Sequence, residues 1–392
     1  MSRMIQEKIK RDLASLCEYR KGKVSVEQLN KNTYISTENM LPNKGGVTSA
    51  TSLPNISLAQ EFRKHDILVS NIRPYFKKIW KAEYDGGCSN DVLVFRAKDD
   101  CDPTFLFYLL ADDNFFNYAT ATAKGTKMPR GDKSAIMQYS VPVFEIDTQK
   151  KIGALLWSID QKVRLNNQIN ENLEQQLRSI FTELFAEKIA NVETNNHLPL
   201  GELVISIDNR GKTPPLETVP TEYPIIDVRA LSGDSRIVNY TNCTKYVSYE
   251  TYSSWFRSGH PKPKDILIST VGSLAEIKIF LGSKGCIAQN VVGFRTRNIS
   301  PYYLYQYLSA IKKDLVAYNI GSVQPSIKVT HIIKHPIYVP TKEELDTFDA
   351  LAENATNTIY NNVLGSECLA NLRDTLLPKL MAGEIDLTEI QF

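Results

Sequence analysis

The sequence repeats itself, because segments of its first half return in the same order in its second half. His65–Ser70 returns as Lys264–Ser269, and Asp91–Arg96 returns as Asn290–Arg295. The other recurring segments are Pro103–Leu110 with Pro301–Leu308, Gly125–Arg130 with Gly321–Ser326, Tyr139–Pro142 with Ile337–Pro340, and the openings Leu16–Lys23 with Leu203–Lys212. Chance does not explain six matches in one order, so the 392 residues are predicted to hold two copies of one structural unit.

Each copy begins with a part that is typical of a small α+β domain. Short apolar runs alternate with Gly, Pro, Asn and Ser, which favours strands joined by turns. The runs are Ile67–Ile72 and Val92–Arg96 in the first copy, and Ile266–Val271 and Val291–Arg295 in the second. A short helix is expected after Asp102, because Asp is favoured at the N-cap and the following Pro103 is tolerated in the first turn.

Each copy ends in a long helical stretch with one narrow apolar face. Its apolar residues step by three and four. They are Ile152, Leu156, Ile159, Val163, Ile169, Leu173, Leu177, Ile180 and Leu184 in the first copy, and Leu345, Phe348, Ala352, Ala355, Ile359, Val363, Leu369, Leu372 and Leu376 in the second. The face is interrupted near Asn166 and near Gly365. A helix of about 40 residues spans roughly 60 Å, and we predict that the two helices pair with each other. The alternative is that each packs against its own α+β part.

Composition and length set the broad class of the protein. Hydrophobic residues make up 42% and charged residues 23%, which excludes a largely disordered chain, and the length indicates two or three domains. The net charge of +2 does not by itself indicate nucleic-acid binding. The six cysteines form no Cys-x-x-Cys pair, which favours free thiols in a reducing compartment. Without an apolar signal core or a membrane-spanning run, we expect a cytoplasmic protein with no membrane partner.

The sequence carries no complete catalytic motif. Gly211–Thr213 matches the end of a phosphate-binding loop, but the glycine required five residues earlier is Ser206. Asp102–Pro103 lacks the second proline of an amino-methyltransferase clamp. His331 and His335 have metal-ligand spacing for a helix, but the strand-like segment that follows predicts extended chain, in which they lie about 13 Å apart. No compact nuclease set of carboxylates and lysine is found either. We therefore expect no catalytic residue, no metal and no cofactor.

Basic and small polar residues gather in loops at equivalent places of both copies. Lys and Arg suit phosphates, whereas Arg, Gln, Asn and Ser at loop tips can read base edges in the major groove. In the first copy the candidate DNA-binding residues are Arg73, Tyr75, Lys77, Lys78, Lys81, Lys124, Thr126, Lys127, Arg130 and Lys133; in the second they are Arg210, Lys212, Thr213, Ser269, Thr270, Ser273, Lys284, Gln289, Asn290, Ser322, Gln324, Ser326 and Lys328. The loop residues differ between copies while the framework is shared, so we predict two different half-site sequences. The alternative for each residue is an ordinary solvated surface position.

Several segments resemble the specificity subunits of Type I restriction–modification systems. Gln149–Leu173 is similar to the central conserved helix of that family, and the ending Leu376–Ile385 is similar to its second helical signature. Leu198–Leu203 and Gly211–Pro215 are similar to the start of its target recognition domains. The opening Arg20–Lys23 departs from the pattern, because it lacks the Thr-Pro-Pro that follows Lys212, and this puts the loop contacts of the first copy in doubt. Together the matches cover the whole chain.

The resemblance implies an α+β fold in which two similar α/β target recognition domains are separated by two long antiparallel helices forming a coiled coil. The implied parts are an N-terminal recognition domain in residues 1–145, a central conserved helix in 146–190, a C-terminal recognition domain in 191–340, and a distal conserved helix with a C-terminal tail in 341–392.

The resemblance also implies a function and partners. Each recognition domain would read one half of a bipartite site in double-stranded DNA, and the helices would set the spacer. Two modification subunits, which are adenine-N6 methyltransferases, would dock on the helices, and restriction (endonuclease and translocase) subunits would join them. Two alternatives stay open: a self-sufficient DNA methyltransferase or nuclease, and a coiled-coil adaptor that binds only proteins.

Overall fold

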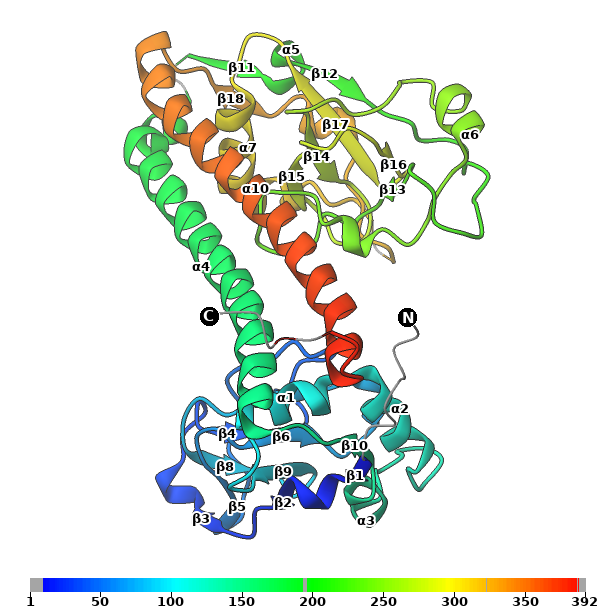
Figure 1. Ribbon diagram of the computed structural model, residues 1–392. Helices are drawn as coiled ribbons and strands as arrows, with labels where there is room; N and C mark the ends of the chain where they lie inside the picture. The colour runs from blue at the N-terminus through cyan, green and yellow to red at the C-terminus, as the bar shows by residue number, and fades with distance from the viewer. Residues whose placement is uncertain (1–9, 193–195, 322, 386, 388–392) are drawn as a thin grey trace. The chain divides into compact units, whose positions relative to one another are not determined.

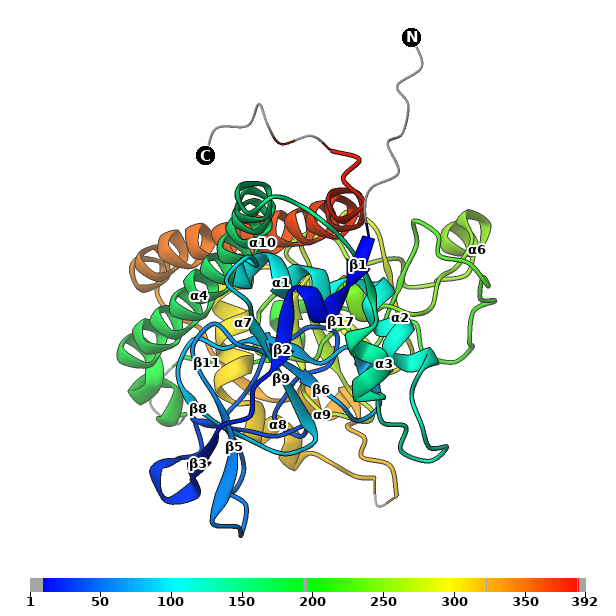
Figure 2. The same ribbon diagram turned by 60° about the horizontal axis from the view of Figure 1, so that its bottom comes forward.

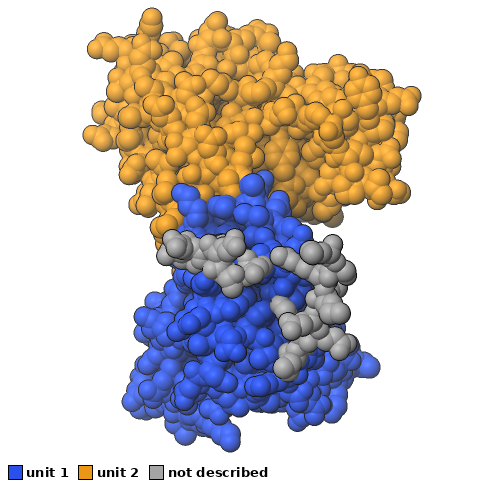
Figure 3. All heavy atoms as spheres, in the orientation of Figure 1, with its two compact units in different colours: residues 1–163, 367–392 blue, residues 164–366 orange. Residues whose placement is uncertain are grey.

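A computed structural model describes residues 10–192, 196–321, 323–385 and 387 of the chain. The chain divides into two compact units, of which unit 1 holds residues 1–163 and 367–392 and unit 2 holds residues 164–366 (Figure 3). The candidate residue Ser322 lies outside the described residues.

Unit 1 contains two four-stranded sheets and a short strand pair. The first sheet has the order β2 (Cys17–Tyr19), β9 (Val92–Ala97), β6 (Ile67–Ser70), β7 (Ile79–Lys81), and its paired strands are antiparallel. The second has the order β3 (Lys23–Ser25), β5 (Leu58–Phe62), β8 (Gly86–Cys88), β4 (Tyr34–Ile35), in which β4 and β8 run parallel. The strand pair consists of β1 (Lys10–Asp12) and β10 (Ser140–Pro142).

Both faces of the first sheet are buried, which explains why Ile67, Leu68 and Val69 of β6 are all apolar. Ile67 and Val69 belong to one apolar cluster together with α1 (Pro103–Ala111), whereas Leu68 belongs to another that includes Phe62 of the second sheet. This division follows from the alternation of side chains along a strand. Unit 1 is therefore layered as helix, sheet and sheet.

Unit 1 also contains shorter helices. They are α2 (Asp113–Ala121), α3 (Lys133–Met137) and the short 3-10 turns η1 (Leu13–Ser15), η2 (Val26–Gln28) and η3 (Pro74–Phe76). The predicted helix start is confirmed, because the side chain of Asp102 accepts hydrogen bonds from the backbone N–H groups of Thr104 and Phe105, and Pro103 stands in the first turn. In unit 2, Ser300 caps the equivalent helix in the same way.

Unit 2 repeats this plan, which confirms the predicted duplication. Its main sheet has the order β12 (Val204–Ile207), β17 (Val291–Thr296), β14 (Ile266–Ser269), β15 (Ile277–Ile279) (Figure 1). Ile266 pairs with Phe294 just as Ile67 pairs with Phe95 in unit 1. The other elements are the parallel pair β13 (Ile225–Ile226) and β16 (Cys286–Ile287), the antiparallel pair β11 (His197–Pro199) and β18 (Pro336–Tyr338), and the helices α5 (Leu200–Leu203), η4 (Tyr240–Asn242), α6 (Tyr249–Ser254), α7 (Pro301–Ala310), α8 (Lys312–Ala317) and α9 (Val329–Ile332).

Two long helices, α4 (Ile146–Ala190) and α10 (Lys342–Met381), follow the short strands β10 and β18. A capping box starts α10: the Thr341 backbone N–H donates to the Glu344 carboxylate at 2.8 Å, and the Glu344 N–H donates to the Thr341 hydroxyl at 3.4 Å. The bound for α4 agrees with the helical stretch expected at 146–190. None of the described helices is long and apolar enough to cross a membrane.

The two helices are antiparallel within each unit. In unit 2 their paired residues are Lys188 with Glu344, Asn170 with Asn362, and Asn166 with Ser366. The numbers fall along one helix while they rise along the other, and Figures 1 and 2 show these segments side by side. In unit 1 an ion pair of 2.6 Å joins Asp160 to Arg373. The predicted fold class, two similar α/β domains and two long antiparallel helices, is confirmed.

The apolar face of the helices differs from the prediction after its interruption. On α4 the buried residues are Leu177, Phe181 and Phe185, whereas Ile180 and Leu184 are only partly buried and Ile169 is 42% exposed. On α10 the buried residues are Leu377, Leu380 and Met381, and Leu372 is 46% exposed. The reason is that each segment packs against two neighbours at once, the other helix and the α/β part of its own unit. Helix pairing and packing on the own domain are therefore both present.

The interruption itself is a layer of polar side chains and not a break in the helices. The Asn362 amide donates to the Asn170 side-chain oxygen at 2.8 Å, and the Asn166 amide donates to the Ser366 hydroxyl at 3.1 Å. Asn166 and Asn170 are buried. Both helices continue through this layer without a gap.

Candidate nucleic-acid interface

Three loops of unit 1 are joined by backbone hydrogen bonds at the end of β6. They are the β6–β7 loop, the β8–β9 turn and the α2–α3 loop. The N–H of Asn71 donates to the carbonyl of Asp91 at 2.8 Å, and the N–H of Arg73 donates to the carbonyl of Pro129 at 2.8 Å. The N–H of Gly131 donates back to the carbonyl of Asn71 at 3.1 Å. These backbone hydrogen bonds therefore join the three loops into one frame.

Unit 2 contains the same frame in the β14–β15 loop, the β16–β17 turn and the α8–α9 loop. The N–H of Thr270 donates to the carbonyl of Asn290 at 2.8 Å, and the N–H of Gly272 donates to the carbonyl of Pro325 at 3.0 Å. The N–H of Ile327 donates to the carbonyl of Thr270 at 2.8 Å. We call these two arrangements the loop frames of unit 1 and unit 2.

The loop frame of unit 1 brings most of the predicted residues of the first copy together. The β6–β7 loop carries Arg73, Tyr75, Lys77 and Lys78, the α2–α3 loop carries Lys124, Thr126, Lys127 and Arg130, and Lys133 opens α3. Lys81 does not belong to this group. It lies in β7, where its ammonium donates to the Thr104 hydroxyl at 3.0 Å and stands 3.7 Å from the centre of the Trp157 ring.

Several cations of this frame are held by carboxylates. Lys124 pairs with Asp132 at 2.5 Å, Lys77 with Asp113 at 2.8 Å, and Arg130 with Asp91 at 3.0 Å. The hydrogen bond to Asp132 raises the pKa of Lys124, so this lysine stays charged well into alkaline solution. Lys78 donates to a backbone carbonyl, that of Thr37, at 2.6 Å. Within the described ranges, no carboxylate forms an ion pair with Lys127 or Lys133, which leaves these two lysines available to phosphates.

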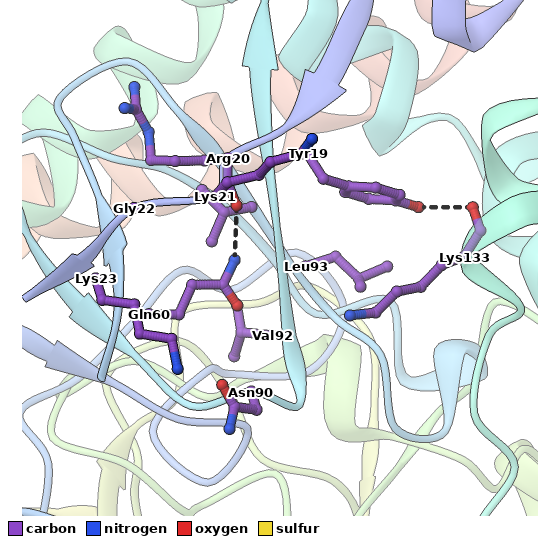
Figure 4. A pocket seen from close by; sticks show the side chains of 11 residues that line it. Tyr19, Arg20, Lys21, Gly22, Lys23, Gln60, Asn90, Val92, Leu93 and Lys133 are labelled. Atoms are coloured by element: carbon purple, nitrogen blue, oxygen red, sulfur yellow. Dashed lines mark hydrogen bonds between the residues drawn. The ribbon is translucent and has the colours of Figure 1, made fainter. Parts of the chain in front are cut away.

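Beside this frame lies a hollow of about 320 Å³ with a strongly basic lining (Figure 4). Lys21 lines it from the chain between β2 and β3, Lys23 from the start of β3, Asn90 from the β8–β9 turn, and Lys133 from α3. The ammonium group of Lys133 points into the hollow, whereas the guanidinium of Arg20 points away and pairs with Asp66 (Figure 4). Of these residues only Lys133 was a predicted DNA-binding candidate, although the local run of Lys and Arg at 20–23 was a usable signal.

In unit 2 the predicted residues divide between the surface and the interior. Ser273, Gln324, Lys328, Lys212 and Thr213 are exposed, while Arg210, Gln289, Asn290 and Ser326 are half-buried. Lys284 is exposed and pairs with Glu222, away from the loop frame. Ser269 and Thr270 are fully buried. The Ser269 hydroxyl donates to the Ser273 carbonyl at 2.5 Å and accepts from the Glu276 N–H at 2.9 Å, so Ser269 shapes the β14–β15 loop from within.

Two hollows adjoin each other next to the frame of unit 2. The smaller, of about 250 Å³, is lined by Gln289 and Asn290 of the β16–β17 turn and by Thr213, whose hydroxyl accepts from the Gln289 amide at 2.9 Å. The larger, of about 510 Å³, is lined by Arg210, Trp255 and Arg257 among others. Both include Asn209 and Lys212. Sequence reasoning missed Asn209, Trp255 and Arg257, and no motif at these positions marks them in the sequence.

Gly211 and the two histidines have structural surroundings. Gly211 occupies a turn with φ of +128°, which agrees with the turn expected before Pro214. The expectation of extended chain at the histidines was wrong: His331 lies in α9, and His335 follows that helix in a turn, with its Nδ1 atom 2.9 Å from the Tyr318 hydroxyl. Over the part of the chain that the structure describes, no group of three or more His, Cys, Asp or Glu residues is arranged to hold a metal ion.

Two copies of one α/β domain, each with an exposed loop frame and each packed on long paired helices, define a protein with duplicated recognition domains. The family profile described as Type I restriction modification DNA specificity domain matches the chain twice, over residues 6–175 and 193–363. The chain therefore belongs to this family.

Relatives and a solved structure agree with this assignment. The Type I restriction enzyme HindI specificity subunit of Haemophilus influenzae is 23% identical over 439 aligned positions, which cover 90% of this chain and 94% of that subunit. The MjaIX specificity subunit of Methanocaldococcus jannaschii is 23% identical over 318 positions, covering 75% and 71%. The crystal structure of a Type I S subunit from M. genitalium has the same fold, with a TM-score of 0.63 at 17% identity and 99% coverage of both chains.

Proposed function

We propose that the chain is the DNA-reading subunit of a Type I restriction–modification complex, in which each α/β domain reads one half of a bipartite site in double-stranded DNA. The observation that carries this proposal is that the two domains share one loop frame but present different side chains on it. Basic residues predominate in unit 1, and hydroxyl and amide groups predominate in unit 2. A shared frame with different donors and acceptors is what reading two different sequences requires.

We further propose that the chain has no catalytic activity of its own and directs adenine-N6 methylation by partner subunits. The incomplete phosphate-binding and methyltransferase motifs support this view. The two long helices carry exposed apolar residues. Leu165 and Ile169 lie one turn apart on α4 and are 50% and 42% exposed, and Leu364 of α10 is 45% exposed. Apolar residues exposed on a long helix are suited to a protein partner. They support the docking of two modification subunits there, with restriction subunits joining the complex.

The proposal is tested by comparing the purified chain with its assembled complex. The chain alone should neither bind S-adenosylmethionine nor methylate DNA. After the modification subunits are added, methylated adenines should map to one split sequence. Methyl transfer by the highly purified chain would contradict the proposal, and so would duplex binding that does not weaken as salt rises, because phosphate contacts release counterions.

A further inference from the structure

The two loop frames identify which side chains occupy equivalent positions. Residue 91 and residue 290 both accept a hydrogen bond from the first residue after β6 or β14, at 2.8 Å in each unit. Arg130 and Ser326 form the same isolated bridge, Arg130 with Ile72 and Ser326 with Val271. The pair Arg130 and Asp91 of unit 1 therefore corresponds to the pair Ser326 and Asn290 of unit 2.

These two positions carry different chemistry on the same backbone. In unit 1 an ion pair of 3.0 Å joins the Arg130 guanidinium to the Asp91 carboxylate, and the two side chains are 57% and 36% exposed. In unit 2 the residues are a hydroxyl and an amide, and the Asn290 side-chain oxygen is buried without a hydrogen-bond partner among the described residues. Since the backbone is shared, the difference in side chains is a difference in what each surface can recognise.

An arginine held by a carboxylate is suited to reading a base. A guanidinium carries five N–H donors, and the ion pair with Asp91 is made through one nitrogen, Nη2. Within the described ranges, the Arg130 side chain makes no hydrogen bond that would occupy its other donors. The pair has no net charge, so its attraction to a phosphate is weakened while its directional hydrogen bonding remains. The neighbouring Lys127 has no such carboxylate and is the better phosphate contact. In the major groove, guanine offers two adjacent acceptors, O6 and N7, to which arginine donates as a fork.

We infer that Arg130, oriented by Asp91, reads a guanine in the half-site of the N-terminal domain. This inference rests on the proposed function and adds to it one base and the residue that recognises it. Asp91 acts as a positioning residue, because it fixes the direction of the guanidinium without contacting the base itself. Ser326 and Asn290 present no cation at the equivalent place, so the C-terminal domain does not read a guanine in this way.

The test transplants the pair of unit 2 into unit 1. The double variant Arg130→Ser/Asp91→Asn is assembled with the modification subunits, and its preferred sites are selected from DNA with randomised half-sites. We expect the preference for guanine to fall roughly tenfold to a hundredfold at one position of one half-site, while the other half-site is unchanged. Lys127→Ala is the matched control, which should weaken binding to all sequences equally and flatten the salt dependence by about one phosphate contact.

Single variants distinguish base reading from phosphate contact. Asp91→Asn keeps the arginine but removes the negative charge beside it, so the surface becomes more positive by one unit of charge. The discrimination in favour of guanine should therefore fall, whereas the binding affinity at low salt should not. If Arg130→Ser flattens the salt dependence and leaves the half-site preference intact, Arg130 contacts a phosphate and the inference is overturned. A wild-type complex with no bipartite preference would instead overturn the proposed function. Retained preference at the other positions of the N-terminal half-site reports that unit 1 of each variant is folded.

Discussion

Arg73 adopts a backbone conformation that is unfavourable for its residue type. Its φ is +50°, and the equivalent residue in unit 2 is Gly272, with φ of +87°. The left-handed conformation costs an L-residue roughly 1–2 kcal/mol, yet unit 1 keeps a long basic side chain there, beside Arg130. Such a residue at the centre of a loop frame is retained for what its side chain does.

We therefore predict an unusual order of stability at this position. In an ordinary conformation glycine is less stable than alanine by about 0.5–1 kcal/mol. Here Arg73→Gly should be at least as stable as Arg73→Ala, because glycine adopts the left-handed conformation freely, and both variants should bind DNA more weakly than wild type. Urea unfolding and DNA titration measure the two effects. A clear stability advantage for Arg73→Ala would show that the left-handed conformation is not maintained in solution.

At the same scale, the sequence predicted residue types better than residue roles. Arg73, Lys127, Lys133 and Arg130 were chosen as candidates because a basic loop residue is visible in the sequence, and their contact with DNA stays a prediction. The burial of Ser269 and Thr270 was not, because a hydroxyl that bonds within a loop looks the same in sequence as one that faces solvent. The carboxylate partners of Lys77 and Arg130, Asp113 and Asp91, come from distant segments, and no spacing rule identifies them.

At the scale of elements, the start of α10 is tied to the end of α4. Glu344 accepts a hydrogen bond from Lys188, and this bond, with those from Thr341 and Tyr338, lowers the pKa of Glu344 from 4.5 to about 2. A carboxyl group whose pKa is lowered by folding stabilises the fold above its unfolded pKa, and this contribution is lost as the pH falls toward the folded value. The relevant window is therefore pH 4.5 down to about pH 2.

Glu344→Gln should lower the free energy of unfolding at pH 6 by no more than about 1 kcal/mol, because both side chains of the pair are partly exposed. The difference from wild type should disappear near pH 2. Glu343→Gln is the matched control, since it removes a neighbouring charge from the same helix turn and leaves the bond to Lys188. Equal losses in both variants at pH 6 would mean that general charge near the helix start is responsible.

The polar layer between the two long helices leads to a second prediction about their stability. Asn362→Leu removes the donor to the buried oxygen of Asn170 and should destabilise unit 2 by about 1–3 kcal/mol. The double variant Asn170→Leu/Asn362→Leu leaves no orphaned group and should recover most of that loss. A double-mutant cycle by urea unfolding gives the coupling. Additive losses would show that the two amides act independently.

The spacing of apolar residues predicted the two long helices but not all of the residues that they bury. The existence and length of both helices followed from steps of three and four. The buried face beyond Asn166 was misplaced, because each helix packs against two neighbours and its buried sector is wider than a single stripe, so Phe181 and Phe185 replaced Ile180 and Leu184 as core residues.

In the whole molecule, the first and the last strand of each domain pair with each other. The first strand of unit 1, β1, pairs with the strand that leads into α4, β10, and β11 pairs with β18 in the same manner in unit 2. The chain thus enters and leaves each domain at one place. This supports the proposed domain limits, 1–145 and 191–340, as units that can be exchanged.

Replacing residues 1–145 by the matching segment of a related subunit should change one half-site and leave the other as it was. The physical reason is that the loop frame of each domain is built only from bonds within that domain. Mapping of methylated adenines by the assembled complex measures the outcome. Changes in both half-sites at once would contradict separate reading by the two domains.

The loop frames have a consequence for how such a protein can change over generations. The hydrogen bonds that join the three loops of each frame run between backbone groups, so substitutions at residues 91, 130, 290 and 326 alter the surface chemistry without removing those bonds. A lineage can therefore acquire a new target sequence through a few surface substitutions while its folding is inherited intact.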